Sequence, residues 1–394
     1  MPAKKIAALN TIYHKYSHAQ HIVDRFLEGY GWQGRHHIPN VQIASMYVDQ
    51  TDKRDLSQDR SERFGVPIYP TIAEALTLGG ETLAVDGVLI IGEHGQYERN
   101  EKGQHLYPRY EFFMEMVEVF RDSGRAVPVF NDKHLSYDWN QAVEMVDISR
   151  ELGFAFMAGS SLPVTWRLPA LEFPLGVEMR EALCACYGGV DSYDFHGLET
   201  AQCMAERRGD GEVGVKSLHA LRGEAVWKAM EDGAFDQELL TAAVARSFTR
   251  QPRRGDSSDI DFQNDRIQDV CPDPTAYLME HRDGLKTTMI LLNGFLLDFN
   301  FAARMGDGSI QSTQMYLPMP PRHTTLASFF SPLCDNLEKM FLTGRPTYPV
   351  ERTLLTTGQV YFGVESLYRG QAKLETPELE VAYQAPAESC FWRD

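Results

Sequence analysis

The feature that most constrains the fold is an alternation of short apolar runs with amphipathic helical patterns over the first 160 residues. The run at 86–91 is almost continuously hydrophobic, as expected of a strand covered on both faces. Elsewhere apolar residues recur at helical spacing, as Phe112, Met116 and Phe120 do. Strands that alternate with helices predict a parallel, doubly wound α/β sheet. We expect strands at 5–10, 41–48, 86–91, 126–130 and 154–158, and helices at 55–64, 71–78, around 112–120 and at 138–152.

The remainder of the chain has a different periodicity. Apolar side chains stand at every second position from 295 to 301, which indicates an antiparallel sheet with one covered face. We therefore predict two domains, an α/β domain at 1–160 and an α+β domain at 161–394 with an open, mainly antiparallel sheet. In the second domain strands are expected at 285–293, 295–303 and 309–317, and helices at 325–342 and 351–368.

Composition limits the class of protein. Of 394 residues, 43% are hydrophobic and 24% charged, a globular balance. The net charge of −17 disfavours a nucleic-acid partner, because a protein that neutralises phosphates is normally basic. The apolar region 289–303 is interrupted by polar residues, so no membrane span is expected. The basic start is followed by only four apolar residues, too few for the core of a signal peptide, so we expect a cytoplasmic protein.

Five stretches of the chain carry a resemblance to a known family: 47–66, 86–91, 127–135, 156–159 and 337–346 with the helix behind it. In this order they resemble the Gfo/Idh/MocA family, the glucose–fructose oxidoreductase-like and inositol dehydrogenase-like proteins. The resemblance covers most of the chain. It implies an N-terminal Rossmann-type domain that binds NAD or NADP, and a C-terminal domain for substrate binding and oligomerisation. The implied activity is an oxidoreductase acting on a sugar, polyol or related hydroxy compound.

The resemblance also implies a homodimer or homotetramer that associates through the open face of the second sheet. The strands at 285–317 carry enough apolar residues for such an interface. They could equally pack on helices of their own chain.

The nucleotide fingerprint of the family, Gly-x-Gly-x-x-Gly, is replaced in this chain. Asn10, Ile12 and Lys15 stand where the glycines would be. The glycines allow a tight turn, close approach to pyrophosphate and close helix packing, and Ile12 is expected to crowd a phosphate. In one interpretation the loop is rebuilt and still holds a dinucleotide, with Lys15 or His14 supplying positive charge. In the other the dinucleotide site is lost and the fold serves another purpose.

Three further residues follow predicted strands and are candidates for the site. Asp49 ends the second strand, where an acidic residue usually binds ribose hydroxyls, and Glu93 follows the strand at 86–91. We count both as candidate cofactor-binding residues. Lys133 lies in the segment that in the family reads Glu-Lys-Pro, where the lysine lies between nicotinamide and substrate. Here its neighbours are Asp132 and His134.

The segment 188–199 resembles the family motif Gly-Gly…Asp-x-x-x-His-x-x-Asp, whose Asp and His face the substrate. His196 and Glu199 match the histidine and the acid after it. The position four before the histidine is Ser192, so the motif's first acid would have to be Asp191, in a looser turn. The resemblance implies His196 as acid/base and Lys133 as the cation that holds the developing alkoxide. The catalytic candidates are thus Lys133, Asp191, His196 and Glu199.

A divalent metal is the alternative to a nucleotide. Asp194, His196 and Glu199 are candidate ligands, and His14 and His18 could bind one ion if their segment is helical. The protein would then be a metal-dependent lyase, epimerase or hydrolase on a polyhydroxylated substrate. A non-catalytic binding protein is the third possibility. The insert 95–109 could cover either kind of site.

Overall fold

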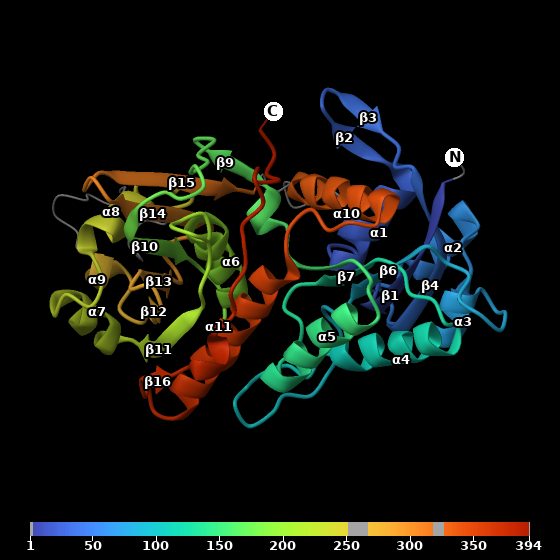
Figure 1. Ribbon diagram of the computed structural model, residues 1–394, viewed down its shortest axis with the longest axis horizontal. Coiled ribbons are helices and arrows are strands. Elements are labelled where there is room, and N and C mark those ends of the chain that lie inside the picture. Colours follow the sequence, from blue (N-terminus) through green and yellow to red (C-terminus); the bar gives the residue numbers. More distant parts are fainter. Residues whose placement is uncertain (1–2, 251–266, 318–326, 394) are drawn as a thin grey trace.

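The computed structural model describes residues 3–250, 267–317 and 327–393. Two sheets lie side by side, each accompanied by helices (Figure 1). The elements around the first sheet are β1 (Lys4–Ile12), α1 (His18–Glu28), β2 (Tyr30–Trp32), β3 (Arg35–His37), β4 (Val41–Gln50), α2 (Ser57–Phe64), β5 (Ile68–Tyr69), α3 (Ile72–Thr77), β6 (Gly87–Ile91), α4 (Arg109–Asp122), β7 (Val129–Asp132), α5 (Trp139–Glu151) and β8 (Phe156–Gly159).

The later elements of the chain are η1 (Leu162–Val164), β9 (Trp166–Leu168), β10 (Met179–Cys186), α6 (Asp194–Ala205), β11 (Val215–Arg222), α7 (Glu224–Glu231), α8 (Gln237–Val244), α9 (Ile267–Val270), β12 (Thr275–His281), β13 (Lys286–Leu291), β14 (Phe299–Met305), β15 (Ile310–Tyr316), η2 (Ser328–Phe330), α10 (Ser331–Thr343), α11 (Val350–Tyr368), β16 (Leu374–Glu375) and η3 (Pro377–Leu379).

The predicted fold class is confirmed. The first sheet is parallel, with strand order β5-β4-β1-β6-β7-β8. The second has the order β16-β11-β12-β13-β10-β14-β15-β9 and is antiparallel except where β10 pairs with β13. The chain leaves the first sheet at Gly159 and enters the second with β9, while the domain bounds 1–160 and 161–394 stay a prediction. Among the described residues no helix is long and apolar enough to span a membrane.

Several predicted elements differ from the structure in their bounds, and the strand expected at 126–130 lies at Val129–Asp132. The strand expected at 295–303 begins only at Phe299, because Phe295 and Leu296 turn back onto Leu292 and pack in the core. The first two residues of the helix expected at 325–342 lie outside the described residues. From Ser328 the chain forms a 3₁₀ turn and then enters α10, which has Pro332 in its first turn.

Helices α10 and α11 connect the two domains. Helix α10 comes late in the sequence but packs on α1 and β4, so that Leu333 and Leu337 share a core with Ile22 of the first domain (Figure 1). Helix α11 runs along both α5 and α6. A buried ion pair joins it to the second domain, with the Arg352 guanidinium 2.5 Å from the Glu206 carboxylate. The first domain is therefore completed by the last part of the chain.

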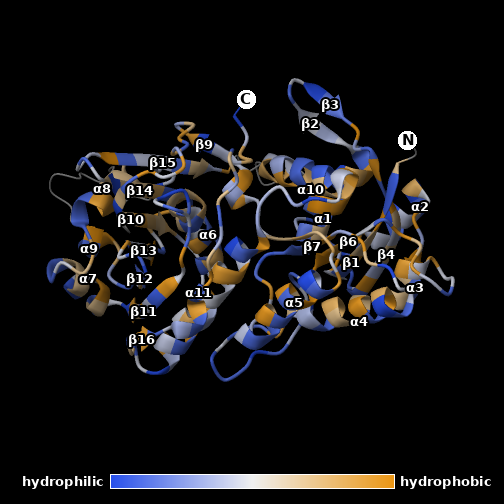
Figure 2. Cartoon of the chain, in the orientation of Figure 1, coloured by the Kyte–Doolittle hydropathy of each residue, from blue (hydrophilic) through white to orange (hydrophobic). Residues whose placement is uncertain are grey.

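The outer face of the second sheet is covered by the chain's own helices. Trp227 of α7 and Leu240 of α8 share a core with Leu183 and Ile290 of the sheet. The sheet strands thus pack on their own helices, the second of the two alternatives left open by the sequence. Figure 2 shows the contrast between these apolar helix faces and the hydrophilic insert between β6 and α4.

Candidate active site

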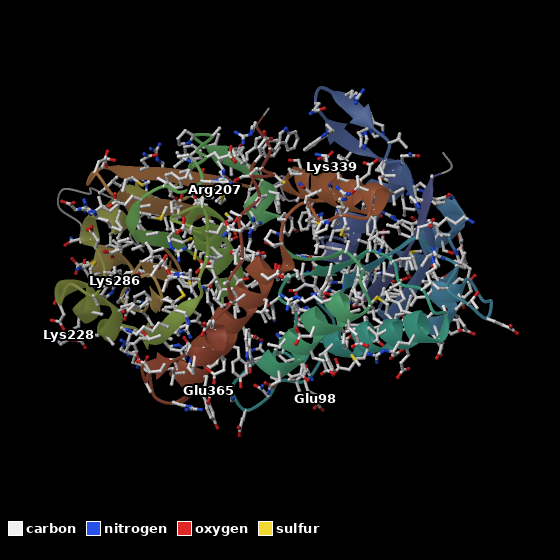
Figure 3. All side chains as sticks on the ribbon, viewed as in Figure 1. Glu98, Arg207, Lys228, Lys286, Lys339 and Glu365 are labelled. Carbon is white, nitrogen blue, oxygen red and sulfur yellow. The ribbon has the colours of Figure 1, made fainter. Side chains whose placement is uncertain are left out.

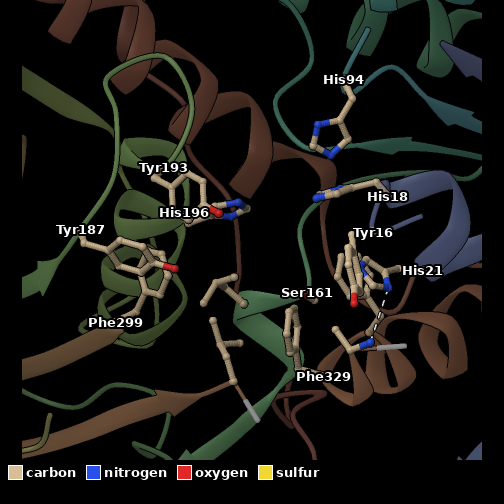
Figure 4. Close-up of a pocket in the computed structure, with 14 residues that line it drawn as sticks. Tyr16, His18, His21, His94, Ser161, Tyr187, Tyr193, His196, Phe299 and Phe329 are labelled. Carbon is tan, nitrogen blue, oxygen red and sulfur yellow. Dashed lines mark hydrogen bonds between the residues drawn. The ribbon is translucent and has the colours of Figure 1, made fainter. Parts of the chain in front are cut away.

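A cavity of about 350 Å³ lies between the two domains. Four histidines line it, three from the first domain and one from the second (Figure 4). Aromatic walls with a few converging polar groups are typical of sites for small molecules. The histidines are His18, His21, His94 and His196, and the aromatic residues are Tyr16, Tyr187, Tyr193, Phe299, Phe329 and Phe330.

Two of the histidines that line the cavity, His21 and His94, are uncharged. Burial, with the nearby charge of His18, lowers the pKa of both His21 and His94 to about 3. Both rings are therefore neutral at physiological pH. The Nε2 atom of His94 is buried and has no hydrogen-bond partner among the described residues. Neutral, hydrogen-bonding rings of this kind suit a molecule with hydroxyl groups better than an anion.

His196 is held by a short relay of hydrogen bonds. The Ser160 hydroxyl and backbone N–H both donate to the Glu199 carboxylate. The Nδ1 atom of His196 lies 3.0 Å from the Ser160 hydroxyl oxygen. Because the hydroxyl proton is already given to Glu199, Nδ1 is the donor, and Nε2 is the nitrogen that can accept a proton. Burial, and then the Lys133 charge, hold the pKa of His196 well below its usual range, so the ring is a neutral base.

Glu199 anchors this relay from the interior. It is 1% exposed and lies on α6 one turn after His196. Burial raises its pKa to about 7, against the lowering effect of the Ser160 hydrogen bonds. Ser160 follows β8 and belongs to no motif in the sequence, so nothing but its position at a strand end could have indicated it.

Lys133 lies behind the cavity wall rather than in it. Its backbone is left-handed, with φ of 65°, and pairs with Gly159. Its ammonium lies 3.2 Å from the Glu93 carboxylate and 5.7 Å from the ring centre of Tyr193, which lines the cavity. Glu93 also binds Arg109 at 2.7 Å. Although burial alone would raise the pKa of Glu93, Lys133 and Arg109 hold it well below the usual range. In this structure Glu93 is the counter-ion of these two cations.

The two aspartates before His196 are engaged elsewhere. The Asp191 carboxylate accepts a hydrogen bond from the backbone N–H of His105, in the insert, at 2.8 Å. Burial and the neighbouring Asp194 raise its pKa to about 7. Asp194 accepts from backbone N–H groups at the start of α6 and from the Tyr277 hydroxyl. Of the four catalytic candidates, His196 alone lines the cavity, with Glu199 in contact through Ser160.

A second histidine with a carboxylate partner was not anticipated from the sequence. The Nδ1 atom of His18 lies 2.7 Å from Asp132, whose side chain is fully buried at the end of β7. The His18 ring packs edge-on against Phe330 and His94. The two partners are 114 residues apart in sequence, so no local pattern could have joined them.

The residues at the fingerprint positions bind their own chain. Strand β1 continues through Ile12, which is buried and pairs with Gln50 of β4. The Asn10 amide donates to the carbonyls of Ala8 and Tyr47. The tight turn expected at this point is replaced by two more residues of strand.

The start of α1, where a pyrophosphate would bind, is satisfied by side chains. Ser17 accepts from the backbone N–H of Gln20, and the Gln20 side chain accepts from the N–H of Tyr16 at 2.6 Å. This reciprocal arrangement resembles a capping box and uses donors that would otherwise face an anion. Lys15 is exposed and its ammonium lies 5.0 Å from the ring centre of Tyr16.

The insert contacts the ribose position. The hydroxyls of Tyr47 and of Tyr97, which belongs to the insert, both donate to Asp49, at 2.9 and 2.6 Å. The side chain of Gln50 exchanges two hydrogen bonds with the backbone of Gln96. As they stand, the residues at the nucleotide positions therefore do not fit a dinucleotide in the usual pose.

The far side of the insert is tied to the second domain. The ammonium of Lys102 pairs with the Glu365 carboxylate on α11. Figure 3 shows Glu98 of the insert and Glu365 along the same edge of the molecule. The insert is thus held to the first domain at Gln96 and Tyr97, and to α11 at Lys102.

The described residues contain no group of three histidine, cysteine, aspartate or glutamate side chains placed to hold a metal ion. Asp194 and Glu199, two of the candidate ligands, bind Tyr277 and Ser160 instead. His14 precedes α1, so the helical spacing with His18 does not arise, although both rings lie near His94.

The likeness of this chain to known proteins lies in its fold. Neither a protein-family model nor a curated protein sequence matches this chain. Solved structures match over nearly its whole length. GenD2 from gentamicin A biosynthesis, in complex with NAD, has a TM-score of 0.57 at 14% identity and covers 95% of this chain and 97% of its own. The chain shares the fold of GenD2.

Two myo-inositol dehydrogenases match in the same way. The enzyme from Lactobacillus casei, in complex with NAD(H) and myo-inositol, has a TM-score of 0.55 at 9% identity, with 95% of this chain and 96% of that one covered. The enzyme from Corynebacterium glutamicum has a TM-score of 0.53 at 10% identity, with 95% and 98% covered. The resemblance to Gfo/Idh/MocA-type proteins is confirmed for the fold.

Proposed function

We propose that this chain is an oxidoreductase-like enzyme that acts on a sugar, polyol or related hydroxy compound in the cavity between its domains. The observation that carries the proposal is His196, a buried neutral imidazole that lines the cavity and is oriented by Ser160 and Glu199. The fold, shared with polyol dehydrogenases, supports the substrate class. The aromatic walls would pack against the C–H faces of a sugar ring.

His196 would take the hydroxyl proton of the bound substrate at Nε2. Its Nδ1–H would remain on Ser160, and Glu199 in its ionised form would balance the positive charge that forms on the ring. Lys133 acts through the field it exerts on His196, since its ammonium lies behind Tyr193. For Asp191 we propose a role in holding the insert over Glu93 and Lys133.

Oxidation that depends on NAD or NADP is the reaction to test first, because GenD2 and the L. casei enzyme were solved with NAD bound. When bound, the nucleotide would supply the hydride acceptor. In this chain the Tyr97–Asp49 and Gln96–Gln50 contacts would have to open to admit it.

The second candidate is a non-redox enzyme, such as an epimerase or lyase, on the same substrate class. One observation favours it: Asn10, Ile12 and Asp49 are all used by the chain itself. Proton transfer at His196 needs no nucleotide.

A nucleotide titration separates the two candidates. NADH and NADPH are added to the purified protein while nicotinamide fluorescence is followed, with and without myo-inositol. Saturable binding that the His196→Gln variant retains, together with turnover that this variant loses, supports the dehydrogenase. No binding at millimolar nucleotide removes the dehydrogenase and leaves the non-redox enzyme.

The homodimer or homotetramer, and the cytoplasmic location, stay predictions. An association through the outer face of the second sheet would place α7 and α8 at the interface, because they cover that face. Size-exclusion chromatography with light scattering measures the molar mass of the purified protein. A mass equal to that of one chain would exclude the oligomer.

A further inference from the structure

We propose that His18, held by Asp132, is a second acid/base group of the cavity and works on the face of the substrate opposite His196. The inference deepens the second candidate of the proposed function, the non-redox enzyme, and rests on the cavity being its substrate site. Figure 4 shows His18 and His196 on opposite sides of the cavity, and they come from different domains. A molecule bound between the domains would therefore have an imidazole on each side.

His18 has the environment of an oriented acid/base residue. Its Nδ1 atom is used by Asp132 at 2.7 Å, so Nε2 is the nitrogen available to the cavity. Edge-on contacts with Phe330 and His94 fix the plane of the ring. A carboxylate on Nδ1 fixes the tautomer of a histidine and balances the charge when the ring takes up a proton.

The side chain of Asp132 has no hydrogen-bond partner other than His18 among the described residues. Its side chain is fully buried, and its second oxygen, Oδ1, has no hydrogen-bond partner there. A carboxylate kept only for helix capping or packing would be exposed or fully bonded, because burying an unpaired oxygen is costly. The hydrogen bond of this carboxylate therefore goes to His18.

The two histidines have unlike surroundings, which divides their roles. His196 reaches its carboxylate only through Ser160 and lies near Lys133, so it is in the neutral form, whose Nε2 can accept a proton. His18 contacts its carboxylate directly through Nδ1, so its Nε2 atom is the one that can pass a proton to a molecule in the cavity.

A hydroxy ketone is the substrate class that this pair would serve. His196 would remove the proton from the carbon next to the carbonyl, so that the C–H electron pair becomes the C=C bond of an enediolate and the carbonyl π pair moves onto its oxygen. His18 would then return a proton to that carbon from the other face, with the electron pair re-forming the C–H bond. Water would take the proton from His196 and return a proton to His18. The carbon is inverted and no oxidant is consumed.

A reactive hydroxy ketone, 1-bromo-3-hydroxypropan-2-one, tests this directly, because it alkylates imidazoles next to which it binds. Labelled histidines are identified by peptide mass spectrometry in the wild type and in the variants His18→Gln, His196→Gln, Asp132→Asn and Asp132→Glu. His36, exposed on β3, reports the background rate within the same molecule. Hydroxyacetone in excess serves as the competitor.

We expect His18 and His196 to be labelled at least about tenfold faster than His36, and hydroxyacetone to protect both. Asp132→Asn should slow labelling at His18 about tenfold and leave His196 unchanged, whereas Asp132→Glu should restore part of the rate. Labelling of His196 with His18 at the background rate would overturn this inference alone. Background labelling at both histidines would overturn the proposed function of the cavity as well. If Asp132→Asn does not fold, the labelling rates of His18 in the wild type and in Asp132→Glu still test the inference.

Discussion

At the scale of single residues, the chemistry of the cavity depends on neighbours that the sequence does not place together. His196 and Glu199 could be predicted from a motif, since they lie one helical turn apart on α6. Ser160, which joins them, could not, because it lies 36 residues before His196 in a strand end without a pattern. The same holds for His18 and Asp132. Contacts between distant residues are set by the fold, and one sequence carries no trace of them.

Glu199 gives a prediction about stability and pH. Its folded pKa of about 7 lies above the ordinary value of 4.5, so the folded state favours the neutral carboxyl. Its stabilising contribution is complete below about pH 4.5 and is lost as the pH rises through about 7, a change of up to about 3 kcal/mol. Glu199→Gln does not ionise. Its free energy of unfolding, relative to the wild type, should therefore rise between these pH values and then level off.

Urea unfolding of both proteins across that pH range measures this difference. Asp191, whose pKa is also raised to about 7, is present in both and cancels. A relative stability that is flat or falls with rising pH would contradict the assignment of Glu199.

At the scale of elements, regular patterns were predictable and their exceptions have physical causes. The parallel strands of the first domain were found because burial on both faces makes them uniformly apolar. Strand β10, Met179–Cys186, was missed because its residues favour helices, and only its place in the centre of a sheet overrides that preference. The insert 95–109 could be predicted as a cover, but its hydrogen bond to Asp49 could not.

The insert gives the second prediction. Tyr97→Phe removes the hydroxyl that binds Asp49 and frees the carboxylate for ribose hydroxyls. One hydrogen bond contributes about 1 kcal/mol, so the affinity for NADH should rise about fivefold. Fluorescence titration measures it, with Tyr110→Phe as the control, since the Tyr110 hydroxyl binds Glu144 on the outside of the domain. An unchanged affinity would mean that the insert does not limit nucleotide entry.

At the scale of the whole molecule, α11 packs against both domains, on α5 of the first and α6 of the second. The helix was predicted at 351–368, close to its bounds of Val350–Tyr368. Its packing against both domains was not, because an amphipathic pattern shows that a face is buried without showing against what. At Gly358 the helix comes so close to Trp139 and Leu379 that an added Cβ would lie 2.7 Å from the Trp139 ring and still nearer to Leu379.

Gly358→Ala therefore tests this packing. The overpacked methyl should lower the free energy of unfolding by about 1–3 kcal/mol, more than the helix propensity of alanine returns. Gly31→Ala is the matched control, because nothing lies within 4 Å of its added Cβ. Thermal melts compare the two variants. Equal melting temperatures would show that α11 is not closely packed against the first domain.

The central claim, that His196 is the acid/base of an enzyme for hydroxy compounds, is tested most directly by kcat/KM of His196→Gln beside His36→Gln. Inositols, aldoses and their keto forms are assayed for oxidation with NAD(P) and for exchange of carbon-bound hydrogen with deuterated water. We predict that His196→Gln lowers kcat/KM by about 10²–10⁴ without a change in melting temperature, and that His36→Gln matches the wild type. A His196→Gln variant within threefold of the wild type would contradict the account.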